Sequence, residues 1–146
     1  MRAPDRDYRW GKLHLLFVYG TMKRGFINHS RLKKAEFISS TTTQDPVYGM
    51  MTKMVDSAHR GIYWAPEVFH IPVGDRIAGE VYAVPGPELF HIDMAEGHPD
   101  TYRRTEIFVN GIDGPVWAYL GDRSKTKCDS WRGIVQLNGI VEFQNG

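Results

Sequence analysis

The amino-acid sequence predicts a single α+β domain, and three features of the chain lead to this prediction. Residues 13–19 and residues 77–84 are nearly continuous apolar runs of the kind that forms buried strands. Between Pro87 and Gly97, apolar side chains recur at the spacing of a helix. A chain of 146 residues buries about 68–70% of the surface of its unfolded form, so a single core suffices to stabilise it.

The charge balance argues against some classes of partner. The chain has 18 Lys and Arg residues against 17 Asp and Glu residues, a net charge of +1, and therefore no general attraction for nucleic acid. No apolar run approaches the length of a membrane span or of a signal peptide, so we expect no membrane partner. The one cysteine, Cys128, rules out an internal disulfide, and the cytoplasm is the expected location.

Residues 1–12 are predicted to be an N-terminal extension that precedes a single domain of residues 13–146. They carry dense charges of alternating sign, few apolar side chains and no periodicity. We expect Tyr8 and Trp10 to attach this extension to the domain, and we expect no catalytic role for it.

A short helix is expected at about residues 28–36. Asn28 or Ser30 is suited to cap it, and Leu32 and Ala35 share the face that would cover the sheet. The basic side chains of this region are not interleaved with aromatic residues, so they indicate a solvated helix face rather than a nucleic-acid surface.

Two further strands are expected at residues 38–43 and 47–51, where β-branched and aromatic residues are frequent. Residues 54–74 are harder to interpret. His59-Arg60-Gly61 and Trp64-Ala65-Pro66 are loop signals, so we expect an irregular excursion over the edge of the sheet or the mouth of a barrel.

The second predicted helix begins at Pro87, whose fixed φ suits a helix start, and ends at Gly97. Leu89, Ile92 and Glu96 follow one another at three to four residues, which puts Glu96 at the end of the inward stripe. A partly desolvated carboxyl there would have a raised pKa, as a general acid or base needs. A lone glutamate beside a glycine is more often solvated, so this residue by itself decides nothing.

The C-terminal residues 134–143 are predicted to form a hairpin around Asn138-Gly139, the strongest short hairpin signal. A hairpin that completes the core is the favoured interpretation. A role at the rim of a pocket or in an interface is the alternative.

The loop after the first apolar run, Tyr19 to Gly25, is the first candidate site. Gly20 is free to take a positive φ, and the backbone amides of Gly20, Thr21 and Met22 would then converge as a nest for a carboxylate or an oxyanion. An ordinary strand-ending turn is the competing interpretation. The glycine spacing of a P-loop is present without its lysine and hydroxyl residues, so nucleotide binding is disfavoured.

Several motifs together are more specific than this loop alone. In chain order they are Tyr19-Gly20-Thr21-Met22, Gly79-Glu80-Val81-Tyr82, Ile92-Asp93-Met94-Ala95-Glu96-Gly97 and Tyr102-Arg103-Arg104. This pattern resembles the γ-glutamylcyclotransferase-like (AIG2-like) superfamily across roughly residues 13–120. The continuation of the first motif to Gly25, with Asn28-His29, looks most like the γ-glutamylamine cyclotransferase branch.

The resemblance implies a small mixed β-barrel with flanking short helices, and a loop whose backbone holds a γ-glutamyl group. It implies that Glu96 is the catalytic acid and base, and that Tyr102 and Tyr119 lie near the site. The implied reaction is the release of 5-oxoproline and an amine from a small γ-glutamyl substrate by intramolecular aminolysis. No cofactor is expected for a reaction in which the substrate supplies its own nucleophile.

Other functions remain open at this point. The same fold would also suit a module that binds a small ligand without turnover, or a tailoring enzyme that removes a γ-glutamyl group from a larger biosynthetic intermediate. Metal binding by His91, Asp93 and His98 is disfavoured, because the first two would project from different faces of the helix. No metal is therefore expected, and the sequence does not predict an oligomeric state.

Overall fold

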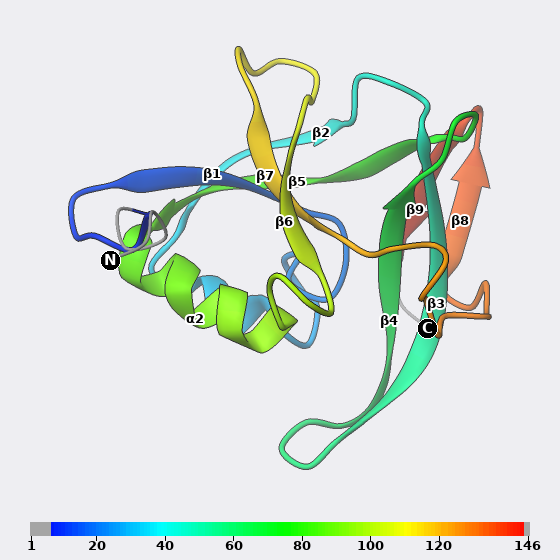
Figure 1. Ribbon diagram of the computed structural model, residues 1–146, viewed down its shortest axis with the longest axis horizontal. Helices are drawn as coiled ribbons and strands as arrows, with labels where there is room; N and C mark the ends of the chain where they lie inside the picture. Colours follow the sequence, from blue (N-terminus) through cyan, green and yellow to red (C-terminus); the bar gives the residue numbers. More distant parts are fainter. Residues whose placement is uncertain (1–6, 145–146) are drawn as a thin grey trace.

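The structure, a computed structural model, describes residues 7–144 (Figure 1). In chain order its elements are β1 (Leu13–Val18), the 3-10 helix η1 (His29–Leu32), β2 (Glu36–Thr42), β3 (Tyr48–Ser57), β4 (Gly61–His70), β5 (Arg76–Pro85), α2 (Gly86–Glu96), β6 (Arg103–Ile107), β7 (Val116–Leu120), β8 (Ile134–Leu137) and β9 (Ile140–Phe143). A seven-stranded sheet has the order β6-β7-β1-β5-β9-β8, with β2 also paired to β5. The hairpin of β3 and β4 is a second, two-stranded sheet.

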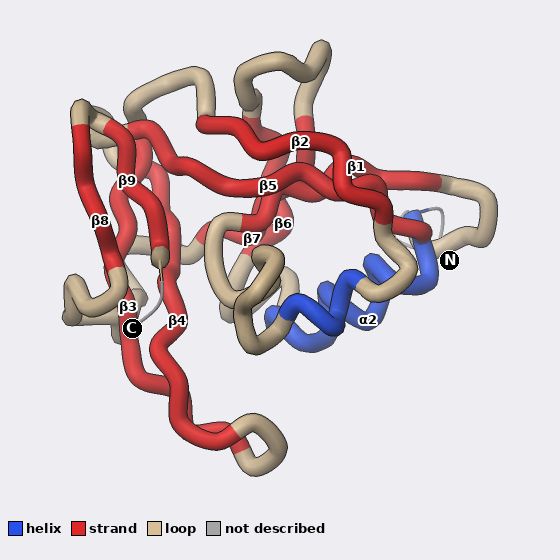
Figure 2. Tube along the Cα trace, turned by 180° about the vertical axis from the view of Figure 1, so that it is seen from behind, coloured by secondary structure: helices blue, strands red, loops and turns tan. Residues whose placement is uncertain are grey.

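The larger sheet is mixed and curved. Strand β1 runs antiparallel to β5 and parallel to β7, and β9 runs parallel to β5. The sheet curls into a half-barrel, with α2 under one end and the β3–β4 hairpin projecting at the other (Figures 1 and 2). The predicted α+β class, with a small mixed barrel and short helices, is confirmed.

Strand β1 lies in the middle of this sheet and is covered on both faces. Leu16 and Val18 pack toward α2, in a cluster that contains Leu89 and Ile92. Phe17, which points to the opposite face, is 1% exposed and belongs to the second core cluster. A strand that is buried on both faces holds the loop at its carboxyl end in a fixed position.

Helix α2 has the boundaries that its proline and glycine residues predict. Pro85 precedes it in an extended conformation, Pro87 lies in its first turn, and Gly97 ends it with a φ of 71°. The amide of Gly97 donates to the last turn, to the carbonyls of Asp93 and Met94. The helix therefore stops directly after Glu96.

The prediction of an irregular excursion at residues 54–74 is wrong. Strands β3 and β4 pair in continuous antiparallel register from Tyr48–His70 to Ser57–Gly61. Pro66 is tolerated inside β4 because it lies opposite Thr52, whose amide donates to the carbonyl of Ser130 and not to β4. Pro66 thus occupies a position where the strand pairing does not require its missing N–H.

The helix expected near residue 28 is a single 3-10 turn, η1, rather than an α-helix. The side chain of Asn28 does not cap it, although Asn28 occupies the N-cap position. Its amide group contacts Thr21 and Tyr63 instead, so the local capping preference gives way to contacts made elsewhere in the fold.

The two ends of the described chain pack against the domain. The ring of Tyr8 lies edge-on to Phe90 of α2 with centroids 5.0 Å apart, whereas Trp10 is 75% exposed. Strands β8 and β9 pair around Asn138-Gly139, whose φ values of 53° and 74° suit a two-residue hairpin turn. Residues 1–6 of the expected N-terminal extension lie outside the described residues, as do residues 145 and 146 of the expected domain.

Within residues 7–144, none of the helices is both long enough and apolar enough to cross a membrane.

Replacing Gly79 of β5 with alanine is expected to destabilise the fold by about 1–3 kcal/mol. A Cβ at this position would lie 2.4 Å from the carbonyl oxygen of Val18 and 2.7 Å from the ring of Phe17, both on the central strand. Urea unfolding measures the change, and Ser40→Ala on the exposed side of β2 is the control. An unfolding midpoint equal to that of the parent protein would contradict this packing.

Candidate active site

A cavity of about 190 Å³ lies beside the loop that follows β1. Its walls come from this loop, from the C-terminal end of α2, from η1, from the β3–β4 hairpin and from two tyrosines near β6 and β7. All the site residues expected from the sequence line it: Tyr19, Gly20, Thr21, Met22, Glu96, Tyr102 and Tyr119. The fold therefore brings together segments that are far apart in the sequence.

The loop after β1 offers free backbone donors. Among residues 7–144, the amides of Gly20, Thr21 and Met22 have no hydrogen-bond acceptor, and all three residues line the cavity. The loop itself is held in place, because the amide of Lys23 donates to the carbonyl of Gly20 at 3.1 Å and that of Asn28 to Thr21 at 2.8 Å. Free amides on a fixed loop suit the binding of an anion.

Glu80 of the second sequence motif forms a hydrogen bond with this loop. Glu80 on β5 accepts a hydrogen bond from the backbone amide of Arg24 at 2.9 Å, and another from the hydroxyl of Tyr82 at 2.9 Å. Glu80 thus contacts the far end of the loop at Arg24.

The expected reason for a glycine at position 20 is incorrect. Gly20 is not among the glycines with positive φ. A Cβ at this position would instead lie 2.6 Å from the ring of Pro66 on the hairpin. The glycine is therefore needed because the hairpin wall approaches the loop closely, and not for its backbone conformation.

Glu96 is the last residue of α2 and its side chain is partly buried in the cavity wall. Burial raises the pKa of Glu96 to about 7, an effect that the positive charge of Arg31 opposes and the negative charge of Asp93 reinforces. A carboxyl with such a pKa is present in both protonation states near neutral pH, so it is able to accept a proton and to return it.

Three tyrosines complete the wall around Glu96. The hydroxyl of Tyr19 donates to the carbonyl of Tyr119 at 2.6 Å, which ties the loop to β7. Burial raises the pKa of Tyr19, Tyr102 and Tyr119 well above the ordinary value. All three hydroxyls therefore stay protonated at neutral pH, and those of Tyr19 and Tyr119 donate to the carbonyl of Tyr119 and to Asp93.

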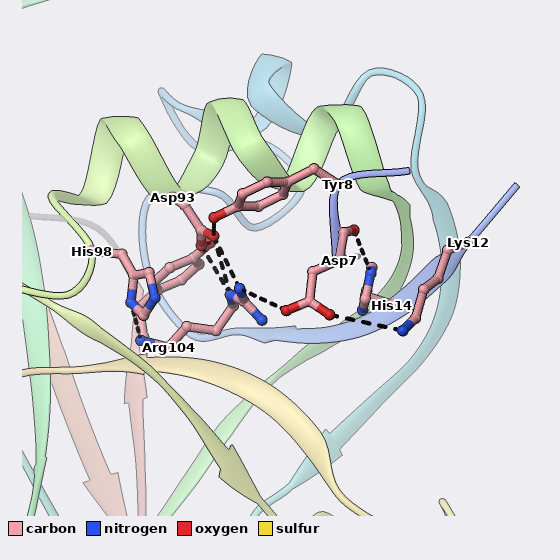
Figure 3. A network of polar contacts seen from close by, with 8 residues as sticks. Asp7, Tyr8, Lys12, His14, Asp93, His98 and Arg104 are labelled. Carbon is pink, nitrogen blue, oxygen red and sulfur yellow. Dashed lines mark hydrogen bonds and ion pairs between the residues drawn. The ribbon is translucent and has the colours of Figure 1, made fainter. Parts of the chain in front are cut away.

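A buried carboxylate fixes α2 one turn before Glu96 (Figure 3). Asp93 accepts hydrogen bonds from Nε of Arg104 at 3.0 Å, from the hydroxyl of Tyr119 at 2.5 Å and from that of Tyr8 at 2.7 Å. Arg104 also reaches Asp7 at 3.4 Å. The sequence motifs contain both Asp93 and Arg104, but the only role considered for Asp93 was that of a nominal metal ligand, and the pair itself was not predicted.

Two of the three residues considered for a metal site, Asp93 and His98, have protein partners. Besides the contacts of Asp93, Nδ1 of His98 accepts a hydrogen bond from the amide of Arg104 at 3.0 Å, and His91 is exposed. Within residues 7–144, no group of three or more His, Cys, Asp or Glu side chains is arranged to hold a metal ion.

Four further polar residues line the cavity: Asn28, Arg31, Lys53 and Tyr63. They were not predicted from the sequence as site residues. Asn28 is 2% exposed, and its Nδ2 donates to Oγ1 of Thr21 at 2.8 Å and to the hydroxyl of Tyr63 at 3.4 Å. Its Oδ1 is buried and has no partner among the described residues. A buried acceptor without a donor at a cavity wall is suited to a ligand N–H group.

Comparison with known proteins gives a consistent result. The sequence profile of the family described as "Gamma-glutamyl cyclotransferase, AIG2-like" matches residues 16–133. This match extends past the C-terminal end of the resemblance noted above. A relative from Methanocaldococcus jannaschii is 33% identical over 112 residues, which are 74% of this chain and 84% of the relative.

Two further comparisons concern a longer relative and a solved structure. The γ-glutamylaminecyclotransferase C of Danio rerio is 33% identical over 107 residues, 69% of this chain, and the chain spans only 65% of that protein. The crystal structure of an AIG2-like protein from Mus musculus superposes with a TM-score of 0.61 at 24% identity, over 79% of this chain and 80% of that one. At this identity the superposition concerns the fold alone.

The titration of Glu96 is expected to lower stability as the pH rises from about 4.5 to about 7. In this window the folded protein holds a proton that the unfolded chain has released, so raising the pH favours unfolding. Glu96→Gln, which cannot ionise, should gain on the order of 2 kcal/mol relative to the parent protein between these limits. Denaturant unfolding across the window measures this, with Glu106→Gln on the exposed side of β6 as control. A difference that does not change with pH would show that Glu96 has an ordinary pKa.

Proposed function

Because this chain belongs to the AIG2-like γ-glutamyl cyclotransferase family, a family of enzymes, we propose that it converts a small γ-glutamyl amide into 5-oxoproline and a free amine. The γ-glutamylamine branch is the nearest choice of substrate, since the Danio rerio relative carries the name of that activity. The chain spans only 65% of that relative, so the activity of the whole protein is proposed and not taken over from the relative.

One observation carries the proposal. The carboxyl of Glu96, with a pKa of about 7, lines the same cavity as the unpartnered amides of Gly20, Thr21 and Met22. A proton carrier beside an anion site is what cyclisation of a γ-glutamyl group requires, because the substrate brings its own nucleophile.

Glu96 carries out two proton transfers in the proposed reaction. It first takes a proton from the α-ammonium group of the substrate, and the free amine attacks the γ-carbonyl carbon to close a five-membered ring. The bond between that carbon and the amide nitrogen then breaks, while Glu96 returns the proton to the leaving nitrogen. The ring nitrogen gives up its second proton to the released amine, which leaves as an ammonium ion, so that the lactam keeps one N–H. The loop amides bind the negatively charged oxygens of the γ-glutamyl half, either its carboxylate or the developing oxyanion.

Asn28 is proposed to orient the nucleophile. Its unpartnered Oδ1 is an acceptor for one N–H of the α-amino group, and its Nδ2 is already held by Thr21 and Tyr63. Tyr102 also lines the cavity, and its raised pKa keeps its hydroxyl protonated, so it serves in this proposal as a hydrogen-bond donor to the substrate.

The released product distinguishes cyclisation from hydrolysis and from binding without turnover. Purified protein incubated with γ-glutamyl-ε-lysine, γ-glutamyl alkylamines and γ-glutamyl amino acids is expected to release 5-oxoproline, detected by mass spectrometry. Acetylation of the substrate α-amine should abolish release, because it removes the nucleophile. Free glutamate would indicate a hydrolase, and tight binding without turnover would favour a binding module. Turnover confined to larger γ-glutamyl intermediates would favour a tailoring enzyme.

The variant Glu96→Gln is expected to lose at least about 10²-fold in turnover while it keeps the fold, because the amide neither accepts nor returns a proton. The rate of 5-oxoproline release measures the loss, and circular dichroism tests the fold. Glu88→Gln is not a suitable control, since Glu88 is buried and accepts hydrogen bonds from Lys34. Glu106→Gln serves instead. Turnover of Glu96→Gln near that of the parent protein would remove Glu96 from the reaction.

A further inference from the structure

We propose that Tyr8 is a positioning residue for Glu96: its hydroxyl completes the contacts that hold Asp93, and through Asp93 the last turn of α2. The inference rests on the proposed function, because it gives Tyr8 a part in turnover. Tyr8 precedes the part of the chain that the family profile matches, which begins at residue 16. None of residues 7–12 lines the cavity, so Tyr8 acts through its neighbours and touches no substrate.

Residues 7–12 pack closely against the start of α2 and against β1. The amide of Gly86 donates to the carbonyl of Lys12 at 3.0 Å. A Cβ on Gly86 would lie 2.6 Å from the carbonyl oxygen of Asp7, so a side chain at this position would displace the segment. Nε2 of His14 on β1 donates to the same carbonyl of Asp7 at 2.7 Å. The segment is therefore held at both ends and approaches α2 in a defined position.

Tyr8 contacts α2 with both its ring and its hydroxyl. The ring lies edge-on to that of Phe90, with the two centroids 5.0 Å apart. The hydroxyl donates to Oδ2 of Asp93 at 2.7 Å (Figure 3). Phe90 and Asp93 are three residues apart, so they are neighbours on one side of the helix. A phenylalanine in place of Tyr8 would keep the ring contact and lose only the hydrogen bond.

The carboxylate of Asp93 depends on the hydroxyl of Tyr8 for one of its two oxygens. Oδ1 accepts from Nε of Arg104 at 3.0 Å and from the hydroxyl of Tyr119. Oδ2 accepts from Tyr8 and, at 3.1 Å, from Nη2 of Arg104, so without Tyr8 it would retain Arg104 alone among the residues described. Nη2 of Arg104 is itself shared with Asp7 of the same segment, at 3.4 Å. A buried carboxylate that loses a donor settles into a new position or pays in stability.

Two routes lead from Asp93 to the cavity. Asp93 lies about one turn before Glu96 on α2, and its carbonyl accepts the amide of His98 at 3.0 Å, directly after the helix ends. The position of Asp93 thus affects the turn that carries Glu96. The second route is Tyr119, which donates to Asp93 and lines the cavity together with Glu96. A change at the hydroxyl of Tyr8 therefore reaches the proton carrier without altering any residue of the cavity wall.

The variant Tyr8→Phe tests the inference in the full chain. It is expected to lower kcat for release of 5-oxoproline from a γ-glutamyl alkylamine by on the order of 10-fold with KM nearly unchanged, because the proton carrier shifts while the cavity walls stay in place. A purely structural role would lower the unfolding temperature and leave kcat unchanged well below it. Tyr48→Phe, at a buried tyrosine of the other core cluster, is the matched control.

If the parent protein is active and kcat of Tyr8→Phe equals that of the parent or of Tyr48→Phe, or if only KM changes, the inference falls while cyclisation stands. If the parent protein releases no 5-oxoproline, the proposed function fails, and the pKa of Glu96 decides instead whether Tyr8 positions it.

The pKa of Glu96 is measured without turnover, by NMR of its side-chain carboxyl carbon across a pH titration. Burial is the main cause of its raised pKa, and the negative charge of Asp93 raises it further, whereas Arg31 opposes the rise. In Tyr8→Phe the charge of Asp93 has one donor fewer to offset it, so the pKa of Glu96 is expected to be higher than in the parent protein and in Tyr48→Phe. In a protein without turnover, equal pKa values in all three would overturn the inference.

Discussion

The arrangement of the site depends on the contacts of one buried carboxylate, that of Asp93. Its side chain is 4% exposed, as is that of Arg104, so both charges are removed from water and each needs the other. The pair joins α2 to β6, and Tyr119 joins the same carboxylate to β7. Since Glu96 follows one helical turn later, these contacts determine how α2 presents its last residue to the cavity.

The two sides of the cavity are built differently. The side with Glu96 and the loop amides rests on the seven-stranded sheet and on α2. The hairpin side is a separate sheet, joined to the rest by single bridges between Tyr48 and Asp75, Thr52 and Ser130, and Phe69 and Gly121. The hairpin is also joined to the rest by side-chain packing, because Tyr48, Met50 and Val68 belong to the same core cluster as Phe17.

Patterns of neighbouring residues predicted the strands and the helix whose positions depend on those residues alone. The apolar runs gave β1 and β5, and the proline and glycine positions gave the limits of α2. The hairpin was missed because Pro66 normally ends a strand, whereas here it lies at a position of β4 where the pairing with β3 needs no N–H. Helical spacing pointed to Glu96 and the loop pattern to Gly20, Thr21 and Met22, and the resemblance added Tyr102 and Tyr119. The contacts of Asn28 and Asp93 were not predicted, since contacts between distant segments leave no periodic signal.

The separate pairing of the hairpin also bears on how such a protein changes over generations. Strands β3 and β4 form a ladder of their own, so residues on their cavity face are replaceable without breaking the ladder of the larger sheet. An altered wall leaves the Asp93 contacts intact and therefore carries little risk for folding. The hairpin wall and the residues that contact Asp93 belong to different segments of the chain, so a substitution in the first removes none of the contacts of the second.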